Sequence, residues 1–222
     1  MSASACPRVV LIHATALAMA PIAAAFARGW PEAELANVLD DSLSVDRSRD
    51  VALTPAMTAR FEALGDYAST IGARGVLFTC SAFGSAIEAV ARRLAIPVLK
   101  PNEAMFEAAF AHGRRIGMVG TFGPSMASMG AEFDEAAGRL APGTTLRDVL
   151  STEARDALDR GDVERHHVLV AEAAATLGDV DAVMLAHFST AGAVDAVRAR
   201  VAVPVLTAPD AAVARIRTLL TG

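Results

Sequence analysis

The chain has 222 residues and a formal net charge of −5, and 53% of its residues are apolar while only 5% are aromatic. This length corresponds to one large or two small domains, and the aliphatic composition favours layered α/β packing over an aromatic-rich β-sandwich. The acidic charge and the lack of a clustered basic stretch argue against a nucleic-acid partner. Only two cysteines occur, which argues against a disulfide scaffold and suggests a reducing compartment, so we expect a cytoplasmic protein.

The first predicted elements lie in the apolar run from position 9 to 26. Residues Val9–Ile12 predict a buried strand, and Met19–Arg28 predict a helix after it. His13 and Pro21 interrupt the run, and a single arginine precedes it, which disfavours both a signal peptide and a membrane helix. We therefore expect a folded first strand and no membrane partner.

A polar segment follows the second predicted strand, Ala36–Leu39. The sequence D-D-S-L-S-V-D-R-S-R-D at positions 40–50 has no core pattern. It predicts either a lid over a binding cleft or a solvated loop, and it makes Asp41 and Ser42 candidate substrate-binding residues. The next predicted helix covers Thr54–Ile71.

The middle of the chain continues the alternation of strand and helix. Gly75–Thr79 predicts a strand, Phe83–Leu94 a helix with an apolar stripe at helical spacing, and Ile96–Leu99 another strand. A helix from Asn102 and a strand at Arg115–Gly120 are expected next. Short apolar runs that alternate with helices predict parallel sheets with right-handed crossovers.

The chain also contains an internal repeat with an offset of 107 residues. Aligned without gaps, Gly75–Leu99 and Ala182–Leu206 share nine of 25 residues, and the same offset pairs Arg8–Thr15 with Arg115–Phe122. A long period that occurs twice indicates a duplicated half rather than a solenoid. We therefore predict an α/β fold of two Rossmann-like or flavodoxin-like halves, with parallel sheets related by a pseudo-two-fold axis and an active site in the cleft between them.

The boundary between the halves is expected near Lys100 and Pro101. We expect the last helix, Asp210–Leu220, to pack back on the first half. The N-terminal half is therefore predicted to comprise residues 1–100 and 208–222, and the C-terminal half residues 101–207.

The repeat places Cys80 and His187 at equivalent positions, each between a strand and a helix. Ligands bind at the carboxyl ends of strands in such folds, and a helix N-terminus favours anions. The same helix N-terminus lowers the pKa of a thiol. Cys80 is therefore predicted to be reactive, with a buried structural thiol as the alternative. An imidazole suits proton transfer at neutral pH, so His187 is either the opposing acid/base or a residue that only binds substrate.

The T-C-S-A sequence at positions 79–82 and the two-half design resemble the aspartate/glutamate/hydantoin racemase superfamily, which also includes maleate isomerase and arylmalonate decarboxylase. The resemblance covers essentially the whole chain. It implies no metal and no organic cofactor. It also implies a cysteine at both strand–helix junctions in the two-base racemases. Cys80 matches the first cysteine, whereas His187 stands at the second position, so a symmetrical two-thiol mechanism is not expected.

The predicted site has two catalytic residues, Cys80 and His187, and a set of substrate-binding residues. His13 ends the first strand, where the resemblance implies a polar group that assists the cysteine, and it could pair with Cys80 as a Cys–His couple. The hydroxyl residues at the helix starts are explained equally well as helix caps. The full binding set is His13, Thr15, Asp41, Ser42, Ser81, Ala82, Thr121, Ser125, Ser189 and Thr190.

These features predict a cofactor-independent racemase or epimerase. Such an enzyme removes and returns a proton alpha to a carboxylate or carbonyl of a small substrate, with Cys80 as the acid/base. An arylmalonate-type decarboxylase and a maleate-type cis–trans isomerase remain as alternatives. A non-catalytic module that binds a small carboxylate is the alternative outside enzymes. The resemblance also leads us to expect a homodimer.

Overall fold

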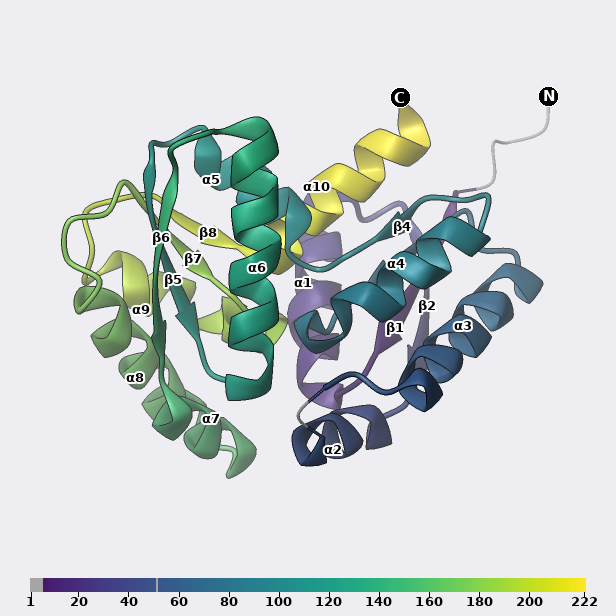
Figure 1. Cartoon of the computed structure of the whole chain (residues 1–222), viewed down its shortest axis with the longest axis horizontal. Coiled ribbons are helices and arrows are strands. Elements are labelled where there is room, and N and C mark those ends of the chain that lie inside the picture. The colour runs from purple at the N-terminus through teal and green to yellow at the C-terminus, as the bar shows by residue number, and fades with distance from the viewer. Residues whose placement is uncertain (1–5, 51) are drawn as a thin grey trace.

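A computed structural model describes residues 6–50 and 52–222, and it contains two four-stranded parallel sheets (Figure 1). The strand order is β2-β1-β3-β4 in the first sheet and β6-β5-β7-β8 in the second. The predicted α/β fold with two parallel-sheet halves is confirmed. The strands are β1 (Arg8–His13), β2 (Glu34–Leu39), β3 (Gly75–Phe78), β4 (Val98–Leu99), β5 (Arg115–Gly120), β6 (Thr145–Leu150), β7 (Ala182–Leu185) and β8 (Val205–Thr207).

The two halves share one topology but not one constant register. Strands β1 and β5 begin 107 residues apart, as do β3 and β7, whereas β2 and β6 begin 111 residues apart. The second half therefore carries four additional residues before β6 and four fewer between β6 and β7. This local shift explains why the ungapped repeat is visible in the sequence around β1, β3 and β4 but not around β2.

Helices cover both sheets. The α-helices are α1 (Met19–Gly29), α2 (Ser42–Arg49), α3 (Pro55–Thr70), α4 (Gly84–Arg93), α5 (Glu103–Phe110), α6 (Gly123–Leu140), α7 (Thr152–Asp159), α8 (Val163–Ala175), α9 (Val194–Arg198) and α10 (Ala208–Thr221). Short 3₁₀ turns occupy Ala16–Ala18, Ser81–Phe83 and Phe188–Ala193. Helix α10 packs against both α1 and α5, so it lies between the halves (Figure 1).

The polar segment at positions 40–50 is helical rather than a loop along most of its length, and its role as a lid stays a prediction. It forms α2, which buries Leu43 and Arg47, one turn apart, toward the first half. Arg47 is held there because its guanidinium donates to the carbonyls of Ala82 and Asp50. A buried arginine stands where an apolar residue would continue the buried face of α2. The hydrophobicity pattern of the sequence therefore does not show the helical period.

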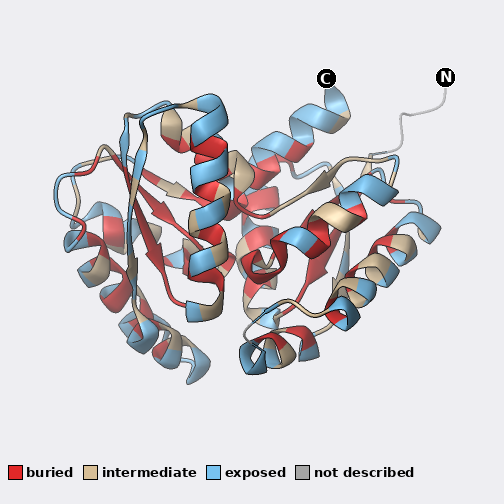
Figure 2. Ribbon diagram, viewed as in Figure 1, coloured by how far each residue is buried: buried red, intermediate tan, exposed pale blue. Residues whose placement is uncertain are grey.

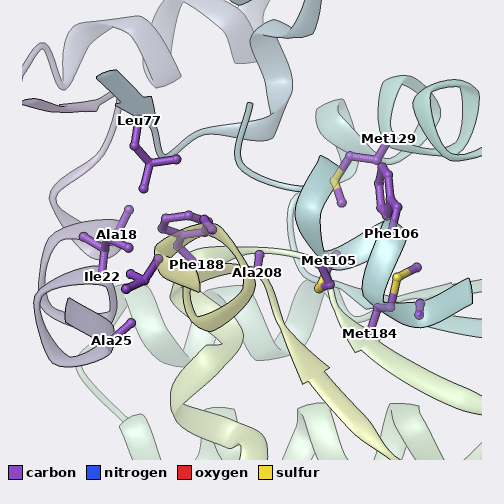
Figure 3. Packing of buried hydrophobic residues seen from close by; sticks show 14 of the residues in the cluster. Ala18, Ile22, Ala25, Leu77, Met105, Phe106, Met129, Met184, Phe188 and Ala208 are labelled. Carbon is purple, nitrogen blue, oxygen red and sulfur yellow. The ribbon is translucent and has the colours of Figure 1, made fainter. Parts of the chain in front are cut away.

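Strands β1, β3, β5 and β7 are largely buried, the edge strands β2 and β6 are partly exposed, and the helices expose their outer faces (Figure 2). One apolar cluster belongs to each half, and a third spans both halves. In the spanning cluster, Phe188 of the second half lies beside Ala18, Ile22 and Leu77 of the first (Figure 3). This packing fixes the relative position of the two sheets. Within the described ranges, no helix combines the length and the apolar character that a membrane crossing requires.

Candidate active site

A pocket lies between the halves at the carboxyl ends of β1, β3, β5 and β7, with an empty volume of about 460 Å³. The parallel strands bring these ends together, and the two duplicated halves face one another across the space. The residues that line it are Thr15, Ala18, Ser44, Thr79, Cys80, Ser81, Pro101, Asn102, Phe122, Arg155, Ala186, His187, Phe188 and Ser189.

Several lining residues are repeat equivalents with different chemistry. Cys80 faces the pocket from the first half and His187 from the second, and Thr15 and Phe122 are related by the same offset. With the 111-residue offset that relates β2 to β6, Ser44 is equivalent to Arg155. The pocket is therefore duplicated in backbone position and asymmetric in its functional groups.

Cys80 is a partly buried free thiol directly after β3. Burial raises the pKa of the Cys80 thiol, and this effect exceeds the opposing effects of the Ala82 backbone N–H, Arg155, Ser44 and Arg47. The lowered thiol pKa predicted from the helix start is therefore wrong for the unliganded pocket. The turn after Cys80 is a short 3₁₀ turn, whose few aligned peptides give a weaker field than a long helix. Cys80 accordingly holds its proton at neutral pH.

His187 directly follows Ala186 after β7, and both of its ring nitrogens have partners within the second half. The backbone N–H of Thr121 donates to Nδ1 at 3.1 Å, so Nδ1 carries no proton. In the neutral imidazole the proton then lies on Nε2, which is 2.6 Å from the Ser125 hydroxyl oxygen. The Ser125 hydroxyl donates in turn to the Phe122 carbonyl at 2.9 Å. These contacts fix one tautomer of His187.

The same environment keeps His187 uncharged. Burial and, to a smaller extent, the nearby charge of Arg155 lower the pKa of His187 to about 4. Protonation would place a hydrogen on Nδ1, where it would face the Thr121 N–H. His187 therefore forms a fixed, neutral wall of the pocket in this structure, which does not match the near-neutral pKa expected for the opposing acid/base.

His13 lies behind the pocket rather than in it. Its side chain is fully buried, with Nδ1 2.8 Å from the Thr79 hydroxyl and Nε2 2.9 Å from Asn37 Oδ1. Because both nitrogens have these partners, the predicted Cys80–His13 couple is not formed. Burial also lowers the pKa of His13. Its contact with the pocket is indirect, through Thr79, which lines the pocket beside Cys80.

Of the other predicted binding residues, Thr15, Ser81 and Ser189 line the pocket. Thr121 and Ser125 instead hold His187, so the predicted anion-binding turn faces the imidazole. The remaining predicted binding residues, Thr190, Ala82, Asp41 and Ser42, lie outside the lining.

The Thr190 hydroxyl accepts from the His187 backbone N–H and donates to the His187 carbonyl, so it stabilises the turn. Ala82 contributes backbone groups, which contact Cys80 and Arg47. Asp41 is exposed, and Ser42 is held by Asp40 and Arg60 on the outer side of α2. Asp40 and Ser42 therefore join a surface network with Arg60, whereas Ser44 of the same segment lines the pocket.

Arg155 is the most consequential lining residue that sequence reasoning missed. Its guanidinium lies 5.4 Å from the centroid of the Phe122 ring, and the hydrogen bonds to Asp159 use only Nε. Among the lining residues that the structure describes, Arg155 is the one side chain charged at neutral pH, and none is acidic. The pocket therefore favours an anion.

Ser44 and Asn102 are the other polar lining residues missed. The Ser44 hydroxyl donates to the Ala14 carbonyl at 2.5 Å and lies beside the Cys80 thiol. Asn102 stands at the start of α5, directly after β4. Within residues 6–50 and 52–222, no three His, Cys, Asp or Glu side chains converge in the manner of a metal site.

A family model described as Asp/Glu/hydantoin racemase matches residues 9–216. The chain belongs to the Asp/Glu/hydantoin racemase family. The match covers nearly all of both halves, so the resemblance seen in the T-C-S-A junction is confirmed. No curated protein sequence matches the chain.

Solved structures of this family share the fold at low sequence identity. A glutamate racemase from Bacillus anthracis superposes with a TM-score of 0.76 at 17% identity, over 96% of this chain and 81% of that one. An allantoin racemase from Klebsiella pneumoniae gives 0.67 at 17% identity, over 96% and 87% of the two chains. A point mutant of arylmalonate decarboxylase gives 0.64 at 20% identity, over 97% and 94%. These likenesses establish the two-domain racemase-type fold.

Proposed function

We propose that this protein is a cofactor-independent enzyme that transfers a proton through Cys80 at the carbon alpha to a substrate carboxylate. Family membership supports the isomerase class, with racemisation or epimerisation as the reaction. The observation that carries the proposal is the position of the Cys80 thiol in a pocket whose charged lining residue is Arg155.

The chemistry follows from these two groups. The Arg155 guanidinium offers charge-assisted hydrogen bonds to a carboxylate, and the backbone N–H groups around Ser81 and Ser189 lie at the opposite turns. When the alpha proton leaves, negative charge spreads onto the carboxylate oxygens as an enediolate, which the same donors stabilise. The Cys80 thiol returns a proton to one face of the carbon, and only its thiolate, which the raised pKa disfavours at neutral pH, can take a proton from that face.

Racemisation requires a second proton carrier at the opposite face. His187 occupies the equivalent position in the second half, but the Thr121 and Ser125 contacts and a pKa of about 4 oppose its protonation. In a racemase, substrate binding would have to release His187 from at least one of these contacts. A measurable change in the His187 tautomer on binding is therefore part of the racemase proposal.

A decarboxylase of the arylmalonate kind is the second candidate, and the His187 geometry favours it. In that reaction the bond between the alpha carbon and one carboxylate breaks, CO₂ leaves, and the electron pair remains as the enediolate. The Cys80 thiol then donates its proton to one face of the carbon, and water reprotonates the thiolate. A single thiol with a raised pKa is in the correct protonation state for this step.

One experiment separates these reactions. The purified protein and Cys80→Ala are incubated in D₂O with amino acids, hydantoins, 2-hydroxy acids and substituted malonates, and proton NMR and chiral chromatography follow the products. Exchange of the alpha proton with loss of optical activity, abolished in Cys80→Ala, supports a racemase. Release of CO₂ with one deuterium in a single configuration supports the decarboxylase. No exchange with any compound, together with binding of carboxylates, would instead indicate a binding module.

A further inference from the structure

Asn102 is a buried residue of the pocket lining whose side-chain amide has no hydrogen-bond partner among the described residues. Its side chain is 0% exposed, and neither Nδ2 nor Oδ1 has a hydrogen-bond partner among the described residues. It nevertheless lines the pocket beside Pro101, at the carboxyl end of β4 and next to the strand that leads to Cys80. Burying an amide without hydrogen bonds destabilises a fold, so such a group in a pocket points to a ligand that completes it.

Helix capping does not explain this residue. Asparagine at a helix start normally accepts a hydrogen bond from the first turn of the helix. At the start of α5 the Asn102 side chain makes no such bond, and only its backbone carbonyl accepts, from the Phe106 N–H. Helix α10, which follows β8 as α5 follows β4, is capped by the Thr207 hydroxyl. The Asn102 side chain therefore stands at a helix start without capping the helix.

The internal repeat carries no second amide at the equivalent position. The residue 107 positions later is Pro209, whose side chain offers no hydrogen-bonding group. The pocket therefore has Arg155, which follows β6, and a neutral amide, which follows β4. This arrangement suits a ligand with a carboxylate at one end and a different polar group at the other.

The chemistry of an amide defines that second group. Asn102 presents a carbonyl acceptor and an NH₂ donor together, whichever way the amide is rotated. A second carboxylate would satisfy Nδ2 but leave Oδ1 buried against an oxygen that has no hydrogen to donate. A –CO–NH– unit whose N–H lies on the same side as its carbonyl oxygen, as in a primary amide, a terminal ureido group or a ring amide, satisfies both atoms at once.

The geometry points to Asn102 as the residue that determines specificity, by pairing with a –CO–NH– unit of a substrate whose carboxylate is held at Arg155. This inference rests on the proposed function, because it assumes that the substrate binds in the Cys80 pocket. It narrows the substrate to small carboxylates that also carry an amide or ureido group.

The test compares two ligands of equal charge. Malonamate and monomethyl malonate each carry one carboxylate and one carbonyl acceptor. They differ in that malonamate has an NH₂ group, with one N–H on the side of its carbonyl oxygen, where the ester has an oxygen. Isothermal titration uses full-length Cys80→Ala, which prevents proton transfer through Cys80 during the measurement. We expect the amide to bind at least about tenfold more tightly than the ester, because only the amide has a hydrogen for Oδ1.

The matched variant is Asn102→Leu in the same background. Leucine fills a similar volume, so we expect the two ligands to bind equally, while the melting temperature stays unchanged or rises because an unpaired buried amide has been removed. A residue that only stabilises the start of α5 would behave differently: its loss would lower the melting temperature and weaken both ligands alike.

Three results would overturn the inference. These are equal affinity for amide and ester in the parent, a preference that persists in Asn102→Leu, and a fall in melting temperature with uniform loss of binding. If neither ligand binds the parent at all, the proposed carboxylate pocket itself is contradicted, and the inference falls with it.

Discussion

Replacing His187 with glutamine tests whether this residue is a neutral wall of the pocket. The pKa of His187 is lowered from the ordinary 6.5 to about 4 by burial, so the unfolded chain takes up a proton at a higher pH than the folded protein. Between these values the unfolded state binds more protons, and the free energy of unfolding therefore falls as the pH falls. The full shift corresponds to about 3 kcal/mol of stability that is present above pH 6.5 and lost by pH 4.

The assay is urea unfolding at intervals from pH 7.5 to pH 4 on the parent, His187→Gln and a control, His112→Gln, at an exposed histidine. Glutamine keeps an acceptor for the Thr121 N–H but does not titrate. We expect the parent to lose about 3 kcal/mol more than His187→Gln across this window, while the control follows the parent. Parallel curves for the parent and His187→Gln would refute the reasoning, because His187 would then titrate alike in both states.

Three further perturbations follow from the pocket and its surroundings. Because burial raises the pKa of Cys80, we expect iodoacetamide to alkylate it more slowly at pH 7 than a free thiol, with the rate increasing up to a pH above the usual thiol range; a rate that saturates near pH 7 would contradict this. Arg155→Gln should weaken binding of malonamate by about tenfold or more in calorimetry, whereas Arg165→Gln, an exposed control on α8, should not. Burial raises the pKa of Glu132 to about 7 despite Lys100 at 4.0 Å, so stability should decrease as the pH rises from 4.5 to 7. Glu132→Gln should therefore raise the melting temperature at pH 8 but not at pH 4, and equal shifts at both pH values would show that the carboxylate charge is not responsible.

The sequence repeat predicted the fold and the two central residues because strands β1, β3 and β4 keep one offset with their counterparts. In the alignment of the two halves, that offset places Cys80 at the position equivalent to His187. Arg155 escaped the comparison because the offset changes from 107 to 111 around β2 and β6. The helix α2 escaped because its buried stripe includes Arg47, whose guanidinium donates to the carbonyls of Ala82 and the nearby Asp50.

The direction in which a side chain faces was the main feature that the sequence could not supply. Thr121 and Ser125 have the residue types of an anion-binding turn, but tertiary packing directs their donors and acceptors at His187. His13 ends a strand next to the pocket, yet Thr79 and Asn37 occupy both of its nitrogens. Asn102 has the residue type of a helix cap, and only its missing cap bond reveals another role. The homodimer stays a prediction, which light scattering of the purified protein would test.

The most direct measurement of the central claim follows deuterium at the alpha carbon of a bound substrate in the parent, Cys80→Ala and Cys80→Ser. The substrate is the compound of the panel that the parent turns over. Our account predicts incorporation by the parent alone, since alanine has no exchangeable proton and a serine hydroxyl is a far weaker acid than a thiol. Undiminished incorporation by Cys80→Ala would contradict the account, because the proton would then pass through another group.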